Sequence, residues 1–223
     1  MMEKHNKERQ QQIPAQQNQL NQNYLELPPT TPEWHSRGYL PHWEAGATAQ
    51  SITFRLKDSL PLTLLDTWCN ELSRLPDNEA ALERRSRIEV ALDKGYGECL
   101  LRDPDVGALL VDALQRFDRL RYELHAWVIM PNHVHVLMTP LSGNSLSAIL
   151  HSWKSFTAKA ANQLLERKGA FWLEEYFDRS IRNQKHYNCV VDYIHNNPVK
   201  AGLCAVAEDW MLSSARRWAE GRE

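Results

Sequence analysis

Short stretches in which apolar and polar residues alternate indicate four β-strands. Residues 51–57 are the clearest case, because Ile52, Phe54 and Leu56 are separated by polar residues, which is the two-residue period of a strand. The second and third stretches are joined by a Pro-Asn pair that predicts a hairpin turn. The four predicted strands are residues 51–57, 122–130, 133–139 and 171–182.

Longer stretches carry apolar residues at the three- and four-residue spacing of a helix. The predicted helices are residues 62–75, 78–94, 104–120, 145–165 and 184–196. We expect the first three, which are rich in acidic residues, to form a solvated outer layer. Pro198 ends the last helix, because the residue before a proline disfavours the α conformation. A short helical turn over residues 198–201 then stops at Gly202.

The order of these elements is strand, helices, strand, strand, helix, strand, helix. Four strands with two helical crossovers in this order predict an α+β protein with a ferredoxin-like antiparallel sheet and helices on one face. The C-terminal helix is additional to that plan, so we expect it on an uncovered edge or face of the sheet.

The two ends of the chain differ in composition from this domain. Of the first 23 residues, 11 are Gln or Asn, so we expect residues 1–27 to form a disordered tail. Residues 28–50 form an aromatic and basic arm, which either packs its aromatic rings on the domain or stacks them on nucleobases. The domain itself spans residues 51–207, with a charged insertion at about 78–105, and we expect the tail, 208–223, to fold back on the core.

Composition restricts the class of protein. The net charge of −2 argues against a globally basic nucleic-acid binder, yet residues 151–200 hold eight Lys or Arg against five Asp or Glu. The four cysteines show no C-x-x-C pair, which fits a reducing cytoplasm. The chain has no apolar run of transmembrane length and no secretory signal, so we expect a cytoplasmic protein without a membrane span.

The most informative stretch is WVIMPNHVHVLMTP at residues 127–140. On a strand, His133 and His135 point to one face, and Val134 and Val136 point to the other. Two imidazoles side by side are a ready pair of metal ligands. The alternative is that both are ordinary polar residues on a half-exposed strand.

The last predicted helix carries a second polar pair, Tyr193 and Asn197, whose spacing of four residues puts them on one helix face. If this helix crosses the histidine strand, a phenol, an amide and two imidazoles would converge. Alternatively, Tyr193 is a core residue, and Asn197 caps the turn that begins at Pro198.

The histidine stretch, followed by FDRSIRN and VVDYIHNNPVKAGL, resembles the REP-associated tyrosine transposases, which belong to the HUH (His-hydrophobe-His) nucleases. The resemblance covers residues 51–218, and RGYLPHW resembles an N-terminal arm of longer members. The charged insertion and the Gln/Asn-rich tail depart from the simplest family pattern.

The resemblance implies a nuclease and strand transferase that acts on single-stranded DNA hairpins of repetitive extragenic palindromes. His133 and His135 match the HUH pair, and Asn197 matches a third ligand of a divalent metal, Mg²⁺ or Mn²⁺. Tyr193 matches the nucleophile that forms a 5′-phosphotyrosine, with Tyr176 and Tyr187 as nearby alternatives. Members of the family include both monomers and swapped homodimers, and a nucleoid-associated protein is expected.

Several polar residues are candidates for contact with DNA, although each is also typical of a solvated surface or a turn. These candidates are Arg37, Lys154, Arg182, Asn183 and Lys200.

Two other functions fit parts of the pattern. A metal-dependent phosphodiesterase that uses activated water would need a carboxylate base near the histidines, and Glu123 is the candidate. A non-catalytic DNA-binding regulator of repeats would keep the scaffold, but the intact histidines and Tyr193 argue against it. An all-β metal oxygenase is excluded by the many helix patterns.

Overall fold

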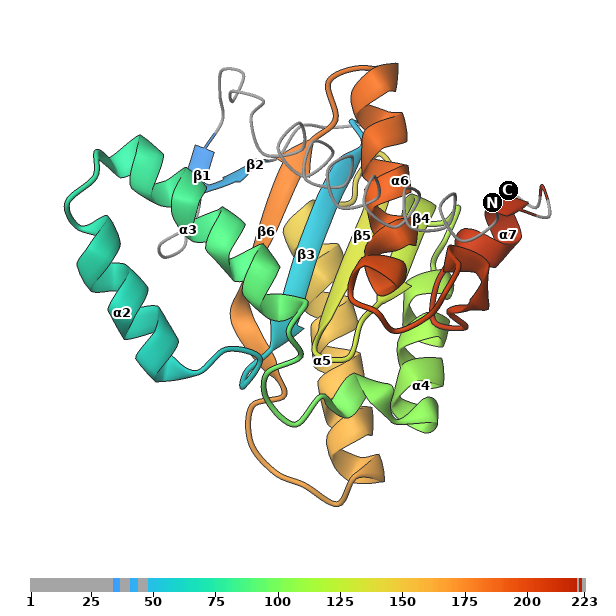
Figure 1. Ribbon diagram of the computed structural model, residues 1–223. Helices are drawn as coiled ribbons and strands as arrows, with labels where there is room; N and C mark the ends of the chain where they lie inside the picture. Colours follow the sequence, from blue (N-terminus) through green and yellow to red (C-terminus); the bar gives the residue numbers. More distant parts are fainter. Residues whose placement is uncertain (1–33, 37–40, 44–47, 220, 222–223) are drawn as a thin grey trace, which may run out of the picture.

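A four-stranded antiparallel sheet forms the centre of the computed structural model, which describes residues 34–36, 41–43, 48–219 and 221 (Figure 1). The strand order is β4-β5-β3-β6. Its strands are β3 (Gln50–Leu56), β4 (Tyr122–Ile129), β5 (His133–Pro140) and β6 (Trp172–Ser180). Two short strands, β1 (Trp34–Ser36) and β2 (Pro41–Trp43), pair separately. The predicted α+β class and all four predicted strands are therefore confirmed.

Six helices accompany the sheet within the described residues, and two short 3₁₀ turns, η1 (Leu100–Arg102) and η2 (Ala207–Asp209), lie between them. The helices are α2 (Leu62–Leu72), α3 (Asp77–Leu92), α4 (Pro104–Gln115), α5 (Leu146–Leu164), α6 (Gln184–Lys200) and α7 (Ala215–Ala219). In the part of the chain that is described, none of them has the length and apolar character needed to cross a membrane.

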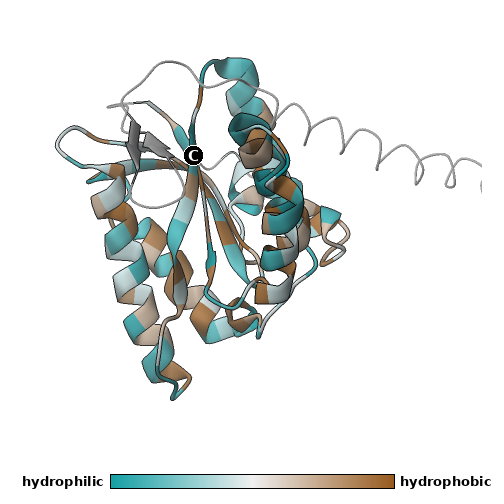
Figure 2. Cartoon of the chain, turned by 90° about the vertical axis from the view of Figure 1, so that its left-hand side faces the viewer, coloured by the Kyte–Doolittle hydropathy of each residue, from teal (hydrophilic) through white to brown (hydrophobic). Residues whose placement is uncertain are grey.

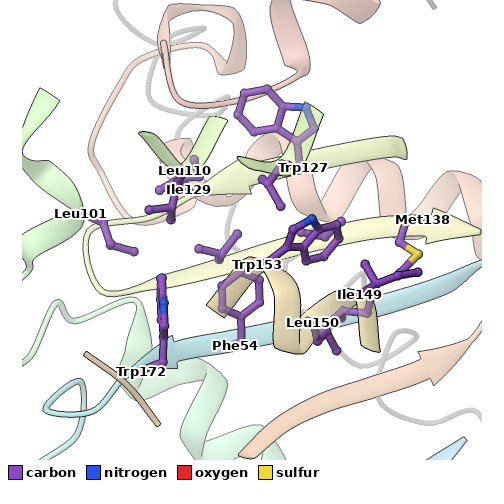
Figure 3. Packing of buried hydrophobic residues seen from close by; sticks show 14 of the residues in the cluster. Phe54, Leu101, Leu110, Trp127, Ile129, Met138, Ile149, Leu150, Trp153 and Trp172 are labelled. Carbon is purple, nitrogen blue, oxygen red and sulfur yellow. The ribbon is translucent and has the colours of Figure 1, made fainter. Parts of the chain in front are cut away.

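The main hydrophobic core lies between one face of the sheet and helices α4 and α5 (Figure 3). Phe54 of β3 contacts Trp153 of α5 and Trp172 of β6, with ring centroids 6.5 and 4.9 Å apart. The indole N–H of Trp153 donates to the Tyr122 hydroxyl at 3.0 Å, so the buried polar atom of this large side chain is satisfied. These aromatic contacts therefore hold this face of the sheet against helix α5.

The opposite face of the sheet is covered as well, so that the strands run between two groups of helices (Figure 2). Helix α6 packs Val190, Val191 and Ile194 on β4 and β5. Helix α3 buries Ile88 and Leu92 next to β6.

The expectation of three solvated outer helices is therefore wrong for α3 and α4. Helix α4 lies in the main core, and α3 buries even a carboxylate, Glu89. Local composition misled the prediction, because the charged residues of α3 surround a narrow apolar strip that depends on the sheet for its burial.

Helix α6 continues through Pro198, which contradicts the predicted end at that residue. A proline near the end of a helix removes only the N–H that would bond to the carbonyl of Ile194, and packing on the sheet holds the helix together. The predicted stop at Gly202 is correct, since this residue has a left-handed φ of 70°. Asn197 is consequently a helix-interior residue, and its interpretation as a cap is wrong.

The C-terminal segment folds back along β4, as expected. The N–H of Ile129 donates to the carbonyl of Leu212 at 2.8 Å, and the N–H of Ser214 donates to the carbonyl of Trp127 at 3.0 Å. The imidazole of His195 on α6 lies 2.8 Å from the Ser214 hydroxyl. This hydrogen bond joins α6 to the returning segment.

His195 makes stability depend on pH. Burial lowers its pKa from 6.5 to about 4, against a small opposing effect of Glu208. The unfolded chain binds this proton first, so the stability contributed by neutral His195 is complete above pH 6.5 and is lost as the pH falls towards 4. We expect His195→Gln, which keeps a hydrogen-bonding side chain, to reduce the pH slope of the unfolding free energy by up to about 1.4 kcal/mol per pH unit.

Urea unfolding at pH 7, 6, 5 and 4 measures this slope. The matched control is His151→Gln on the exposed side of α5, which should leave the slope unchanged. Equal slopes for His195→Gln and the unaltered chain would contradict the prediction.

Candidate active site

The two histidines of β5 lie side by side on one face of the sheet, where Tyr193 of α6 contacts His135. Helix α6 lies over β4 and β5 (Figure 1). Val134, Val136 and Met138 point into the main core on the other face, as the two-residue period predicted. The Nε2 atoms of His133 and His135 are 3.1 Å apart, and the two side chains are 1% and 2% exposed. The strand thus directs two imidazoles towards one buried point.

The other nitrogen of each ring is held by a neighbouring side chain. Nδ1 of His133 lies 2.8 Å from Oδ1 of Asn132, whose amide N–H donates to the carbonyl of Tyr96 at 2.9 Å. Nδ1 of His135 lies 2.8 Å from Oγ1 of Thr53 on β3. With the protons on both Nδ1 atoms, the two Nε2 lone pairs face each other, which is the orientation of histidines that bind a metal.

The donor set fits a divalent metal ion. Two nitrogen ligands at about 2.1 Å from one ion, at a right angle, are about 3.0 Å apart, and the observed separation is 3.1 Å. Asn197 is 1% exposed, and among the described residues neither its amide oxygen nor its amide nitrogen has a hydrogen-bond partner. Among the described residues no group of three His, Cys, Asp or Glu side chains is placed to hold a metal. An additional protein ligand would therefore be an amide such as Asn197.

Electrostatics keep both imidazoles neutral. Burial, together with Lys200 and Arg55, lowers the pKa of His133 to about 3. Burial and the neighbouring His133 push the pKa of His135 well below its ordinary value. Neutral imidazoles retain the lone pairs that metal ligation requires, so the site is ready for a cation over the whole physiological pH range.

Tyr193 is the tyrosine that lies next to His133 and His135. Its ring contacts the ring of His135 edge to face, with centroids 5.3 Å apart. Nζ of Lys200 lies 5.9 Å from the centre of the Tyr193 ring and forms an ion pair with Asp93 of α3 at 2.6 Å. Helix α6 therefore brings the phenol and a cation to the histidines, and α3 holds that cation.

The two alternative tyrosines lie elsewhere. Tyr176 packs against the main core on the far face of the sheet, and Tyr187 contacts His125 at a ring distance of 5.5 Å. Glu123, the candidate base of a phosphodiesterase, is exposed and pairs with Thr139, about 13 Å along β5 from His135. The structure does not bring these side chains to the histidines.

The remaining predicted residues are spread over the molecule. Lys154 is on α5, on the opposite side of the sheet, where its Nζ donates to the carbonyl of Glu174 at 2.5 Å. Asn183 caps α6 by accepting from the N–H of His186 at 2.8 Å, and Arg182 precedes it in the chain. Arg37 lies outside the described residues.

Sequence patterns missed several residues of the site. Thr53 is found only through the pairing of β3 with β5, in which it stands opposite His135. Asn132 belongs to the Pro-Asn pair of the predicted hairpin turn, and the sequence does not indicate that its side chain holds His133. Asp93 was hidden in the charged helix α3, whose contact with α6 no local pattern indicates.

Comparisons with known proteins agree with this arrangement. Residues 110–197, which hold both histidines, Tyr193 and Asn197, match the family model described as Transposase IS200 like. A REP-associated tyrosine transposase of Escherichia coli (strain K12) is 32% identical over 98 residues, which are 43% of this chain and 56% of that protein. A protein of Haemophilus influenzae is 28% identical over 113 residues, or 46% of this chain and 64% of its own length. The chain thus spans a little over half the length of the curated relatives that it matches.

A solved structure of a REP associates tyrosine transposase bound to a REP hairpin resembles this fold. Its TM-score is 0.54 at 21% sequence identity, and the match covers 86% of this chain and 88% of the other. The predicted relationship to the REP-associated tyrosine transposases is confirmed. The match to the IS200-like transposase model extends over residues 110–197, which is less than half of the chain.

Proposed function

We propose that this protein is a metal-dependent tyrosine transposase that cleaves and rejoins single-stranded DNA at palindromic hairpins. The observation that carries the proposal is the contact of Tyr193 on α6 with His135, which lies beside His133 on β5. Asn197 is buried one helical turn after Tyr193 on the same helix. Elements separated by some 50 residues bring together a metal-ligand pair and a phenol. The relatives named above, one of them bound to a REP hairpin, support the same substrate class.

His133, His135 and Asn197 are the proposed ligands of the metal, Mg²⁺ or Mn²⁺. A mixed set of nitrogen and oxygen donors suits Mn²⁺ better than Mg²⁺, which prefers oxygen. When bound, such an ion supplies Lewis-acid stabilisation to the phosphate and to the departing 3′ oxygen. Thr53 and Asn132 hold the two imidazoles in the orientation that this requires.

Tyr193 is the proposed nucleophile. Its phenol loses a proton and attacks the phosphorus, a phosphorus–oxygen bond to Tyr193 forms, and the bond to the 3′ oxygen breaks. The 3′ oxygen takes up a proton and leaves as a hydroxyl group. The 5′ phosphate stays on Tyr193 as an aryl ester, whose good leaving group allows a later 3′ hydroxyl to reseal the strand without ATP.

Contacts to the DNA backbone are proposed from Lys200 and Arg182, which lie near the two ends of the tyrosine helix. Lys154 and Asn183 have structural partners, and any DNA contact from them or from Arg37 stays a prediction. Tyr193 lies against His135 of its own chain, and we propose a site formed within one monomer, with a swapped homodimer as the alternative.

The fold plan, the domain limits and the cellular location are also part of the proposal. The sheet order β4-β5-β3-β6, with helical crossovers after β3 and β5, supports the ferredoxin-like plan. The domain limits at residues 51 and 207 and the cytoplasmic, nucleoid-associated location are also proposed. The rival functions, a regulator without catalysis and a phosphodiesterase, are separated from ours by the following experiment.

Replacing Tyr193 by Phe removes the nucleophile and leaves the ring packing on His135 in place. With end-labelled single-stranded palindromic hairpins and Mn²⁺, we expect the unaltered chain to form a covalent adduct with the 5′ side of the cut. We expect at least about 1,000-fold less adduct from Tyr193→Phe, because the residual catalytic groups have no nucleophile to activate. Denaturing gels measure the adduct.

Tyr187→Phe is the control, since it alters a tyrosine of the same helix that contacts His125. Cleavage that persists in Tyr193→Phe would indicate metal-activated water. Binding without cleavage by the unaltered chain, across several repeat sequences, would favour the regulator.

Replacing Thr53 by Val tests the metal site. The substitution keeps the shape of the side chain but removes the oxygen that lies 2.8 Å from Nδ1 of His135. We expect Mn²⁺ to bind about 10- to 100-fold more weakly, because the imidazole loses the partner that fixes its orientation. Isothermal titration measures the affinity, and Thr53→Ser should retain it. Equal affinity of Thr53→Val and the unaltered chain would refute the proposed role.

A further inference from the structure

Four charged side chains join α3 to α6 beside the candidate active site. On α3, Arg85 forms an ion pair with Glu89 at 3.3 Å. Asp93, at the C-terminal cap of α3, forms an ion pair with Lys200 in the last turn of α6 at 2.6 Å. The exposed fractions of the four side chains lie between 8% and 21%, so salt and water screen these charges only weakly. We call these four residues the α3–α6 charge network.

Lys200 connects the network to the histidines and the tyrosine. Its Nζ lies 5.9 Å from the centre of the Tyr193 ring. Burial is the largest cause of the low pKa of His133 and of His135, and the positive charge of Lys200 lowers both pKa values further. The ammonium is therefore within electrostatic range of the point that both imidazoles face.

Lys200 needs a partner to stay at this place. A lysine ammonium is strongly hydrated and sits on a flexible four-carbon stem, so it turns towards solvent unless a fixed anion holds it. A divalent cation at the histidines would also repel it. The Asp93 carboxylate supplies the opposite charge, and Asp93 is itself fixed, because its backbone N–H donates to the carbonyl of Glu89 at 3.4 Å.

The ion pair leaves the ammonium able to bind a second anion. An ammonium group has three N–H donors, and one carboxylate has two oxygens, so at least one donor is left for another acceptor. Arg85 and Glu89 compensate each other in the same way, and the network as a whole has two cations and two anions. Asp93 thus balances the charge of Lys200, and Lys200 keeps a donor for a phosphate oxygen.

We propose that Asp93 is a positioning residue, which holds the Lys200 ammonium beside Tyr193 so that it contacts a non-bridging oxygen of the phosphate that Tyr193 attacks. Asp93 itself touches no substrate and acts through Lys200. Helix α3 belongs to the charged insertion, so the insertion becomes part of the active site. This proposal rests on the proposed function and gives a role in it to a segment outside the family motifs.

A double-mutant cycle on the full chain tests the positioning. The rate of adduct formation is measured with saturating single-stranded hairpin and Mn²⁺. We expect Asp93→Asn and Lys200→Met each to lower this rate about 10- to 100-fold, because a misplaced group loses most of its effect. The double variant should be within about 2-fold of Lys200→Met, since Asp93 has no other route to the reaction.

Affinity for the hairpin separates positioning from a general structural defect. Asp93→Asn removes a negative charge, so we expect it to bind the hairpin at least as tightly as the unaltered chain while it reacts more slowly. A structural defect would weaken both. Asp77→Asn is the control, because it removes the same charge from the exposed first turn of α3, and it should leave the rate unchanged.

Mn²⁺ affinity, measured by isothermal titration, is a readout that does not depend on catalysis. In Asp93→Asn the ammonium has lost its counter-charge, and we expect Mn²⁺ to bind about 3- to 10-fold more weakly. Adding Lys200→Met to Asp93→Asn should restore the affinity of the unaltered chain. If Asp93→Asn does not fold, Asp93→Glu keeps the charge on a longer side chain, and it should lower the rate but retain the Mn²⁺ affinity.

Adduct formation as fast in a folded Asp93→Asn as in the unaltered chain would overturn the positioning role alone. Additive losses in the double variant would overturn it as well. Absence of adduct in the unaltered chain would refute the proposed function, and the Mn²⁺ affinities would then decide the role of Asp93. Affinity that Lys200→Met does not restore in the Asp93→Asn background would count against that role.

Discussion

Two buried imidazole nitrogens stand 3.1 Å apart with their lone pairs directed at one point, and this arrangement constrains the molecule around it. A second proton on each ring would place two positive charges in contact in a dry environment, so both rings stay neutral. Their orientation depends on fixed partners, which Thr53 and Asn132 supply. The strand that carries them is also paired on both sides, with β3 and β4, which leaves it little freedom to move.

The two faces of the sheet serve different purposes. Helices α4 and α5 cover one face with an apolar, aromatic core that sets the shape of the sheet. The other face carries polar groups at depth, and several of these form ion pairs, such as Lys200 with Asp93 and Arg85 with Glu89. Helix α3 therefore supports helix α6 electrostatically, although the composition of α3 is that of a surface helix.

Much of the fold was predictable from periodicity. The two-residue period placed His133 and His135 on one face, and the helical spacing placed Tyr193 and Asn197 on another single face. Burial of α3 was not predictable, because a charged helix with few apolar residues shows its inner face only when the sheet is present. The passage of α6 through Pro198 depended on tertiary packing, which overrode the local preference of the chain.

Some residues of the candidate site were likewise predictable from the sequence, and others were not. Residues within a motif were found, whereas Thr53 and Asp93 act through strand pairing and helix contact and have no motif of their own. Lys154 was predicted to contact DNA, and it lies on α5 on the opposite side of the sheet from the histidines, so a DNA contact from it stays a prediction.

The returning C-terminal segment has a consequence for how this protein behaves in solution. An open sheet ends in a row of unpaired backbone groups that invite another strand, and such edges promote aggregation. Along β4 that row is partly occupied, because Ser213 bridges Val128 and the indole N–H of Trp210 donates to the carbonyl of Ile129. Residues 210–214 thus cover part of the β4 edge of the sheet, and fewer backbone groups of that edge are exposed to a strand of a second molecule.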